Sequence, residues 1–484
     1  MLLTEKSNKL LSLISQLDKP RIKACRKLLR SPWFGGNQNL EDLFVAIAKL
    51  VKAGKPVDKQ QVWQQVFGPE KAYNDVRFRK FSSDLFKLVR EFYLQEALAQ
   101  EPHLRDYLYL SALEKDQPEK LVRSVERNWA QLKESGERYE VDTYLYDHLL
   151  EKRKYTLLNY RHRPFDHTNM EAISGALDSY FIITKLMHAA YAQVRLQTEQ
   201  TTYDLQLVPE IITYLEEHPR YLQEPLIALY FFMYKMLDVQ NSEEANDHKL
   251  YEQYIETIKL HGDHLPLERG YEFIQPALNY SRRYINRGDA KFLGEYLRLY
   301  QYALDREFVF DRGVLDPLQF RNTILTALRL GEFEWAERYI TDYQHRLPAK
   351  QRQNAVTYNS ATLYFYQKDY DRALEFLRDV EYENTTYNLN AKSMLLAIYY
   401  ETETFDALDS LFDAINSYLH RHKELPESAV KAFGNLVSFT LRLTRLLPDD
   451  KRSLEVLKAD FAGKKYIASR PWLAEKIAAF EEKR

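Results

Sequence analysis

Three segments in the last third of the chain repeat one spacing of apolar residues, and this repetition constrains the fold more than any other feature. Within each segment the apolar positions are separated by three, four and three residues, which places them on one face of an α-helix. Successive segments begin 37 and then 35 residues apart. Recurrence at such a period is typical of solenoids, in which each unit buries its apolar face against its neighbours. The segments are Phe333-Ala336-Ile340-Tyr343, Tyr370-Ala373-Leu377-Val380 and Phe405-Leu408-Phe412-Ile415.

The composition also favours helices. Of 484 residues only 14 are Gly, whereas 36 are Tyr and 25 are Phe. Tight β-turns depend on Gly, so we expect few of them. Tyr rings fill gaps between helices while their hydroxyls reach water. A chain of this length exceeds one hydrophobic core. We therefore predict an all-α protein, with an N-terminal helical module followed by an α-solenoid of antiparallel helix pairs.

Four regions are predicted along the chain. Residues 1–100 form a basic helical module, 101–300 an irregular helical-repeat region, 301–425 the clear repeats, and 426–484 the C-terminal capping helices. Whether the second region is a true repeat stays open. Periodicity and break signals in the first region predict helices over Thr4–Leu17, Pro20–Leu29, Leu40–Ala53, Asp58–Phe67 and Asp75–Ala99. Further on they predict helices over Val208–Glu217, Pro225–Leu237, Glu243–Leu260 and Leu267–Ile285.

The strongest break lies between the second and third of these helices, where Pro32 and the pair Gly35-Gly36 both interrupt helical structure. Trp33 and Phe34 lie inside this loop. We expect these two rings to hold the loop against the core.

The repeats resemble tetratricopeptide repeats. In the best unit Ala361, Tyr364, Tyr370 and Ala373 match the spacing of that family, and the turn at Leu330-Gly331-Glu332-Phe333 is typical of it. Ile324, Leu396 and Leu408 depart from the pattern because a small residue is usual at those positions, and no unit shows the closing proline in place. The match covers about 100 residues well and about 250 loosely. The resemblance implies a right-handed solenoid.

The resemblance also implies a concave groove, lined by the first helix of each pair, that receives a peptide or a partner helix. Some members of that family bind a terminal carboxylate with a set of Lys and Asn residues, and this set is not reproduced in the sequence. An equally good interpretation is that several of the groove residues pack against the next helix. By position, the groove residues would be Arg321, Leu325, Arg329, Tyr358, Thr362, Phe365, Tyr366, Ala397 and Tyr400.

No motif supports enzymatic chemistry. The sequence contains no GxGxxG, GxxxxGK[ST], HExxH or GxSxG pattern. The single cysteine, Cys25, excludes an intramolecular disulfide and Cys-rich zinc sites, and is expected to be a buried small hydrophobe. Asp449-Asp450 is interpreted as a helix N-cap. Histidine pairs at 162/167, 261/264 and 420/422 are interpreted as helix-end residues. We therefore expect no catalytic residue, no metal and no cofactor.

Charge is unevenly distributed. The first 100 residues carry 18 Lys/Arg and 10 Asp/Glu, whereas the other 384 carry 50 and 60. Clustered cations on one face are the electrostatic footprint of phosphate contacts, although such faces are often only solvated or meet an acidic partner. Nucleic-acid binding joined to a tetratricopeptide-like sensor is thus the alternative function. The candidate surface comprises Lys19, Arg21, Lys23, Arg26, Lys27, Arg30, Arg77, Arg79 and Lys80.

The N-terminal segment has charges inside its apolar run, so it lacks a signal-peptide core. No apolar stretch reaches the length of a membrane span, and we expect no membrane insertion and a cytoplasmic location. The sequence leaves the oligomeric state open. It predicts a non-enzymatic scaffold or adaptor that binds a protein or peptide partner.

Overall fold

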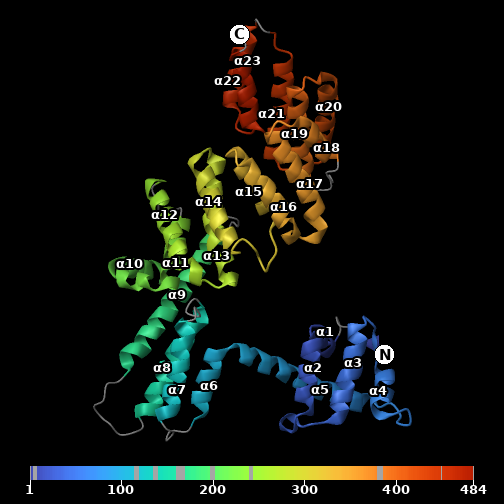
Figure 1. Cartoon of the computed structure of the whole chain (residues 1–484), viewed down its shortest axis with the longest axis vertical. Coiled ribbons are helices and arrows are strands. Elements are labelled where there is room, and N and C mark those ends of the chain that lie inside the picture. Colours follow the sequence, from blue (N-terminus) through green and yellow to red (C-terminus); the bar gives the residue numbers. More distant parts are fainter. Residues whose placement is uncertain are drawn as a thin grey trace. The chain divides into compact units, whose positions relative to one another are not determined.

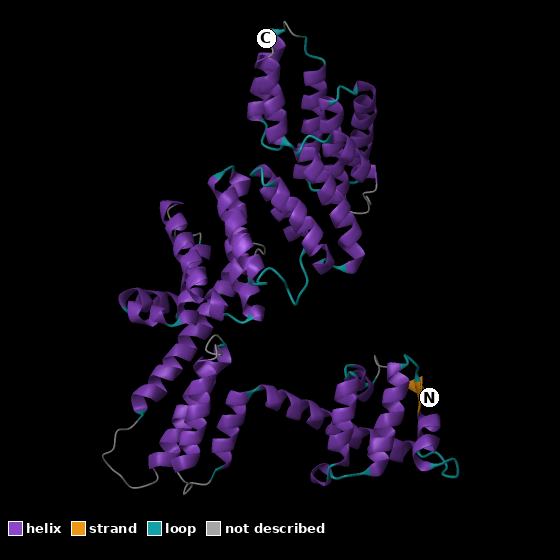
Figure 2. Cartoon of the chain, in the orientation of Figure 1, coloured by secondary structure: helices purple, strands orange, loops and turns teal. Residues whose placement is uncertain are grey.

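The computed structural model of the chain is helical almost throughout (Figures 1 and 2), which confirms the all-α prediction. Contacts divide the chain into two compact units, Met1–Thr184 and Lys185–Arg484, with the division inside helix α9 (Met170–Leu196). The four finer regions predicted above stay predictions. The residues that the structure describes are 2–3, 8–113, 119–134, 140–159, 169–196, 202–238, 244–378, 385–447 and 450–482.

The first unit begins with five helices around a common core. The side chain of the residue preceding each helix accepts a hydrogen bond from a backbone N–H of the first turn, which stabilises the helix start. A two-residue antiparallel pair of strands, β1 (Leu2–Leu3) and β2 (Val57–Asp58), adjoins them. The helices are α1 (Lys9–Ser15), α2 (Lys19–Arg30), α3 (Gln38–Lys52), α4 (Lys59–Phe67) and α5 (Asp75–Gln100).

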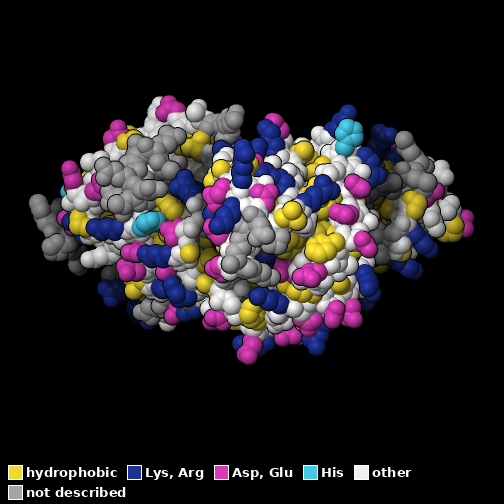
Figure 3. Space-filling view, turned by 90° about the horizontal axis from the view of Figure 1, so that it is seen from above, with side chains coloured by type: hydrophobic (Ala, Val, Ile, Leu, Met, Phe, Trp, Pro, Cys, Tyr) yellow, Lys and Arg dark blue, Asp and Glu magenta, His cyan; other side chains and the backbone are white. Residues whose placement is uncertain are grey.

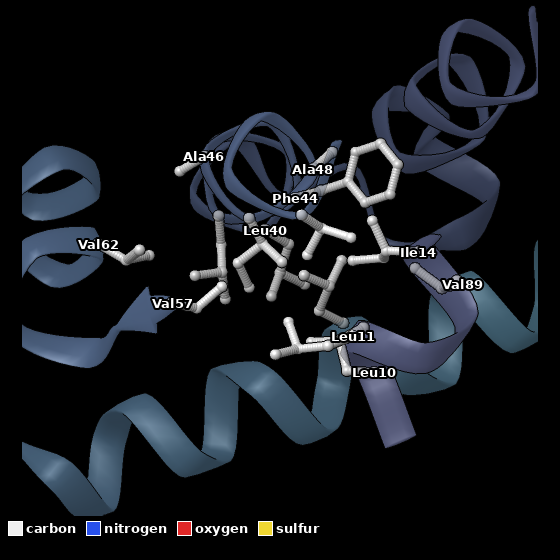
Figure 4. Packing of buried hydrophobic residues seen from close by; sticks show 14 of the residues in the cluster. Leu10, Leu11, Ile14, Leu40, Phe44, Ala46, Ala48, Val57, Val62 and Val89 are labelled. Carbon is white, nitrogen blue, oxygen red and sulfur yellow. The ribbon is translucent and has the colours of Figure 1, made fainter. Parts of the chain in front are cut away.

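The core of this module is apolar and closely packed (Figure 4). Leu10, Leu11 and Ile14 from α1 meet Leu40 and Phe44 from α3. All five predicted helices are present, although residues 4–7 of the first lie outside the described residues. Cys25 is fully buried, which confirms its interpretation as a small core residue.

The loop before α3 differs from its prediction. Pro32–Phe34 form a short 3₁₀ turn, and Trp33 is 88% exposed. The expectation that Trp33 holds the loop against the core was therefore wrong. Backbone hydrogen bonds within the turn hold it instead, from Phe34 N and Gly36 N to Ser31 O.

The first unit continues with helices α6 (Pro102–Ala112), α7 (Glu119–Glu134), α8 (Val141–Asn159) and the first part of α9. The indole N–H of Trp129 on α7 donates to Asp147 on α8. Arg153 on α8 closes the end of α6 by donating to the carbonyls of Leu110 and Leu113, each at 2.9 Å. These polar bonds tie the three helices together around a small apolar cluster.

The second unit begins around α11 (Pro225–Leu237), which is apolar and buried on nearly all sides. The predicted bounds of α10 (Val208–Glu217) and α11 are confirmed. Neighbouring elements are η4 (Pro219–Gln223), α12 (Glu244–His261), η5 (Gly262–His264), α13 (Leu267–Arg287) and α14 (Lys291–Asp305).

Three helix pairs follow, and within each pair the two helices pack against each other. Val380 of the second predicted segment lies outside the described residues. The pairs are α15 (Pro317–Arg329) with α16 (Phe333–Tyr343), α17 (Ala349–Tyr366) with α18 (Tyr370–Arg378), and α19 (Thr385–Glu401) with α20 (Phe405–Arg421); η6 (Gln344–Arg346) lies between the first two pairs.

The turn inside each pair has the same backbone geometry. Gly331, Lys368 and Glu403 all have positive φ, at 79°, 62° and 54°. The next residue in each turn donates its backbone N–H to a carbonyl five residues earlier, at 2.9 Å in all three cases. This is the pattern of a Schellman helix end. Gly288, between α13 and α14, repeats it with φ 96°.

The connections from one pair to the next also recur. Pro266, Pro348 and Pro426 each directly precede a helix, and the carbonyl of each accepts the N–H of the residue three positions later, at 2.9 Å. A Leu comes before each of these prolines. The fixed φ of Pro suits the residue that opens a helix.

The C-terminal helices α21 (Glu427–Thr444), α22 (Lys451–Gly463) and α23 (Arg470–Glu482) share an apolar cluster with α19 and α20. The side chain of Asp450 caps α22 by accepting from Ser453 N at 3.0 Å, as predicted. Asp449 lies outside the described residues. Among the described helices, none has the length and apolar character needed to cross a membrane.

Candidate partner-binding surfaces

The predicted groove residues on α15 lie on one face of the helix. Arg321, Leu325 and Arg329 are four residues apart, so they follow one another along that face. Arg321 and Leu325 are half-buried and Arg329 is exposed. Helix α15 packs against α17, the first helix of the next pair.

On α17 the predicted residues divide into two groups. Tyr358 and Thr362 are buried, and Thr362 Oγ1 donates to Tyr358 O at 2.9 Å. Phe365 and Tyr366 are half-buried, with their rings edge to face at 5.8 Å. Burial raises the pKa of the Tyr366 hydroxyl, and the charge of Arg329 opposes this rise. Tyr366 and Arg329 are therefore electrostatic neighbours.

On α19 the predicted residues take part in packing. Ala397 is buried. The ring of Tyr400 meets that of Trp472 on α23 edge to face at 5.5 Å. The indole of Trp472 donates to Glu401 at 2.8 Å, and Lys476 forms an ion pair with the same carboxylate at 2.7 Å. Tyr400 thus borders the closing helix α23.

The nine groove residues therefore do not all have the same surroundings. Tyr358, Thr362 and Ala397 are core residues, and Tyr400 adjoins the C-terminal helices. The remaining five lie on two adjacent helices and keep part of their side chains in solvent. We call this set the α15–α17 patch: Arg321, Leu325, Arg329, Phe365 and Tyr366.

In the basic module every arginine of the candidate surface contacts a neighbouring side chain. Arg21 forms an ion pair with Glu96, and Arg79 forms one with Asp75. Arg77 lies over the rings of Phe67 and Phe81.

Arg26 and Arg30 bind the same buried carboxylate, that of Glu41, at 2.8 and 2.7 Å. The bonds from Arg30 and Arg26 hold the pKa of Glu41 below its usual range against the effect of burial. Much of the positive charge predicted from the sequence is thus balanced inside the module. Lys19, Lys23, Lys27 and Lys80 are exposed.

Elsewhere the surface has mixed charge. On the face drawn in Figure 3, Lys/Arg and Asp/Glu side chains are interspersed with apolar ones. Within the described ranges, no cluster of three or more His, Cys, Asp or Glu is arranged to hold a metal ion. His261, His420 and His422 lie at helix ends, as predicted, whereas His162 and His167 lie outside the described residues. Comparisons with protein-family models, curated proteins and solved structures gave no match to this chain.

Proposed function

We propose that this chain is a non-enzymatic scaffold whose helix pairs form a right-handed, tetratricopeptide-like solenoid that binds a segment of a protein partner. Two recurring geometries support the solenoid. The turns at Gly331, Lys368 and Glu403 have the 37- and 35-residue spacing of the sequence repeat. Leu-Pro connections recur at Pro266, Pro348 and Pro426, and the last two of these follow the second helix of a pair.

The α15–α17 patch is the observation that carries the binding role. It combines two aromatic rings and two arginines on adjacent first helices. Aromatic residues and Arg contribute most to binding hot spots because they offer large contact areas with few torsions to restrict. Rings that are already half-buried lose little further conformational entropy when a partner covers them.

Affinity capture with variants tests this function. Tagged full-length protein is used on native lysate, with half of the lysate treated with nuclease, and bound proteins are identified by mass spectrometry. We expect a discrete protein partner that survives nuclease and is lost with the double variant Arg329→Ser, Tyr366→Ala. The control is Phe405→Ala, which removes an exposed ring from the second helix of a pair.

Equal retention of the partner by the double variant would refute the patch assignment. Loss of all partners after nuclease treatment would favour the nucleic-acid alternative. Tyr400 is unsuitable for this test because its ring packs against Trp472.

A further inference from the structure

Trp33 is the most exposed large apolar side chain among the described residues, at 88%. An indole ring is usually buried because it removes a large apolar area from water. Here the backbone holds the ring outward. Gly35 and Gly36 have φ of 92° and 33°, and Gly35 N donates to Pro32 O at 3.1 Å. The turn therefore displays Trp33 on an ordered backbone.

A hollow of about 590 Å³ adjoins this turn. It is lined by residues from the starts of α3 and α5, and Asn37 connects it to the turn. Asn37 lies four positions after Trp33, so the two Cα atoms are at most roughly 14 Å apart. Leu40, Phe81 and the 80% exposed Val76 give the hollow an apolar side, and Asn37, Asn74, Arg77, Lys80 and Asp84 complete its lining. This lining suits an apolar side chain that is flanked by polar groups.

Cations lie on the helix before the turn and in the lining of the hollow. Lys23, Lys27 and Arg30 follow one face of α2 up to the turn, at positions four and three residues apart. Arg77 and Lys80 line the hollow itself. From Lys19 to Leu40 the sequence contains no acidic residue.

Of the acidic side chains near this surface, those of Glu41 and Asp84 form ion pairs, and that of Asp42 accepts a hydrogen bond from Gln38 at 2.9 Å. The carboxylate of Glu41 is buried beneath Arg26 and Arg30. Asp84, which lines the hollow, forms an ion pair with Lys87 at 3.2 Å. The surface is therefore complementary to a ligand that carries negative charge.

We propose that this surface binds an acidic segment of a partner protein. A bulky apolar side chain of the segment enters the hollow, its carboxylates meet Lys23, Lys27 and Lys80, and Trp33 covers one side. A peptide explains this surface better than a nucleic acid does, because phosphates favour arginines, and four of the five arginines of the candidate surface already bind carboxylates of their own module.

A peptide selection tests the inference even though the partner is unidentified. A display library of random peptides is selected on the full-length protein, and enriched peptides are synthesised with a fluorescent label. Anisotropy then measures their binding to wild type, Trp33→Ser, Lys80→Glu and, as a control, Leu260→Ser. Leu260 is 73% exposed and lies in the second unit.

We expect enriched peptides to be acidic with an apolar residue, and to bind at least tenfold more weakly to Trp33→Ser and Lys80→Glu than to wild type. Leu260→Ser should bind them normally, and added salt should weaken binding. Circular dichroism should be unchanged, since both substituted side chains are exposed. The Arg329→Ser, Tyr366→Ala variant should also bind normally, which separates this surface from the α15–α17 patch.

Three results would overturn the proposal. One is no enrichment of acidic peptides, and another is equal binding of such peptides by wild type and Trp33→Ser. The third is binding through Trp33 of oligothymidylate or of phosphatidylserine vesicles, used as competitors, with no binding of acidic peptides. That result would assign the surface to nucleic acid or to a membrane surface.

Discussion

Cys25 shows how burial sets the chemistry of a single side chain. Its thiol is fully buried, and burial raises the pKa of the thiol to about 12. Because the thiolate is the reactive form, the folded protein should resist thiol reagents. We expect labelling by iodoacetamide at neutral pH to be negligible over an hour in native buffer and complete in denaturant. Rapid native labelling would show that the α2–α5 core opens readily.

Glu41 is the central residue of a second local arrangement, because Arg26 and Arg30 both form ion pairs with its carboxylate. Glu41→Gln removes the buried charge that accepts four hydrogen bonds from Arg26 and Arg30, so we expect the free energy of unfolding of the first unit to fall by about 1–3 kcal/mol at neutral pH. Denaturant unfolding measures this change. Glu70→Gln, at an exposed carboxylate, is the control and should have no effect.

The pH dependence of the Glu41 contribution follows from the lowered pKa of Glu41 in the folded state. Its stabilisation is fully present above the unfolded pKa of about 4.3 and is lost as pH falls through the folded pKa. The difference between wild type and Glu41→Gln should therefore be constant from pH 7 to about pH 5 and shrink in acid. A difference that grows in acid would contradict this assignment.

At the scale of elements, strongly periodic helices could be predicted from the sequence. The bounds of α10 and α11 match their predictions, and α5 differs by one residue at its end. Apolar periodicity and Pro or Asn at helix starts are local signals, so they could be read directly. The position of a loop side chain depends on tertiary packing instead, which is why Trp33 was wrongly expected to lie on the core.

The recurring Leu-Pro connections were missed for a different reason. Leu-Pro pairs begin at Leu265, Leu347 and Leu425 and precede α13, α17 and α21, so they recur at every fourth α-helix, and this dipeptide recurrence could have been read from the sequence. The recurrence of the dipeptide was overlooked because each unit was compared singly with the family pattern. For the candidate site, helical spacing predicted which residues share a face. Helical spacing could not distinguish the buried Tyr358 from the half-exposed Tyr366, because the burial of each side chain depends on the neighbouring helices.

The repeated turns allow a matched substitution series. Lys368 and Glu403 adopt a left-handed conformation that is strained for residues with a Cβ, whereas Gly331 adopts it freely. We expect Lys368→Gly and Glu403→Gly to stabilise the protein by about 0.5–1 kcal/mol, and Gly331→Ala to destabilise it by about 1 kcal/mol. Lys368→Ala is the control and should be neutral. Thermal unfolding measures all four, and destabilisation by both Gly variants would contradict the shared turn geometry.

Two glycines inside helices should respond oppositely to the same change. A methyl group at Gly270 on α13 would overlap the ring of Phe308, whereas at Gly294 on α14 its nearest neighbour is the flexible side chain of Arg298. Gly270→Ala should therefore destabilise by about 1–3 kcal/mol through overpacking. Gly294→Ala should stabilise by up to about 1 kcal/mol through helix propensity. Denaturant midpoints measure both, and equal effects would show that Phe308 does not pack on Gly270.

At the scale of the whole molecule, the two units divide the proposed roles. The Trp33 surface belongs to the first unit and the α15–α17 patch to the second. Charge is divided in a similar way along the chain, because the first 100 residues have an excess of basic residues and the rest have an excess of acidic ones. Two surfaces with separate ligands would let one chain hold two partners, and linking them would raise the effective concentration of each for the other.

If the two units fold independently, a destabilising substitution in one unit should leave hydrogen exchange in the other unit unchanged. Glu41→Gln should accelerate hydrogen exchange in α2 and α3 and leave α13 and α14 unchanged, whereas Gly270→Ala should do the reverse. In the double variant the two losses of unfolding free energy should add within about 0.5 kcal/mol, because distant sites without shared partners are independent. Hydrogen exchange read by mass spectrometry measures each helix. If Gly270→Ala instead accelerates exchange in α2 and α3, the units unfold as one cooperative structure, and a ligand at either surface would then stabilise the other unit as well.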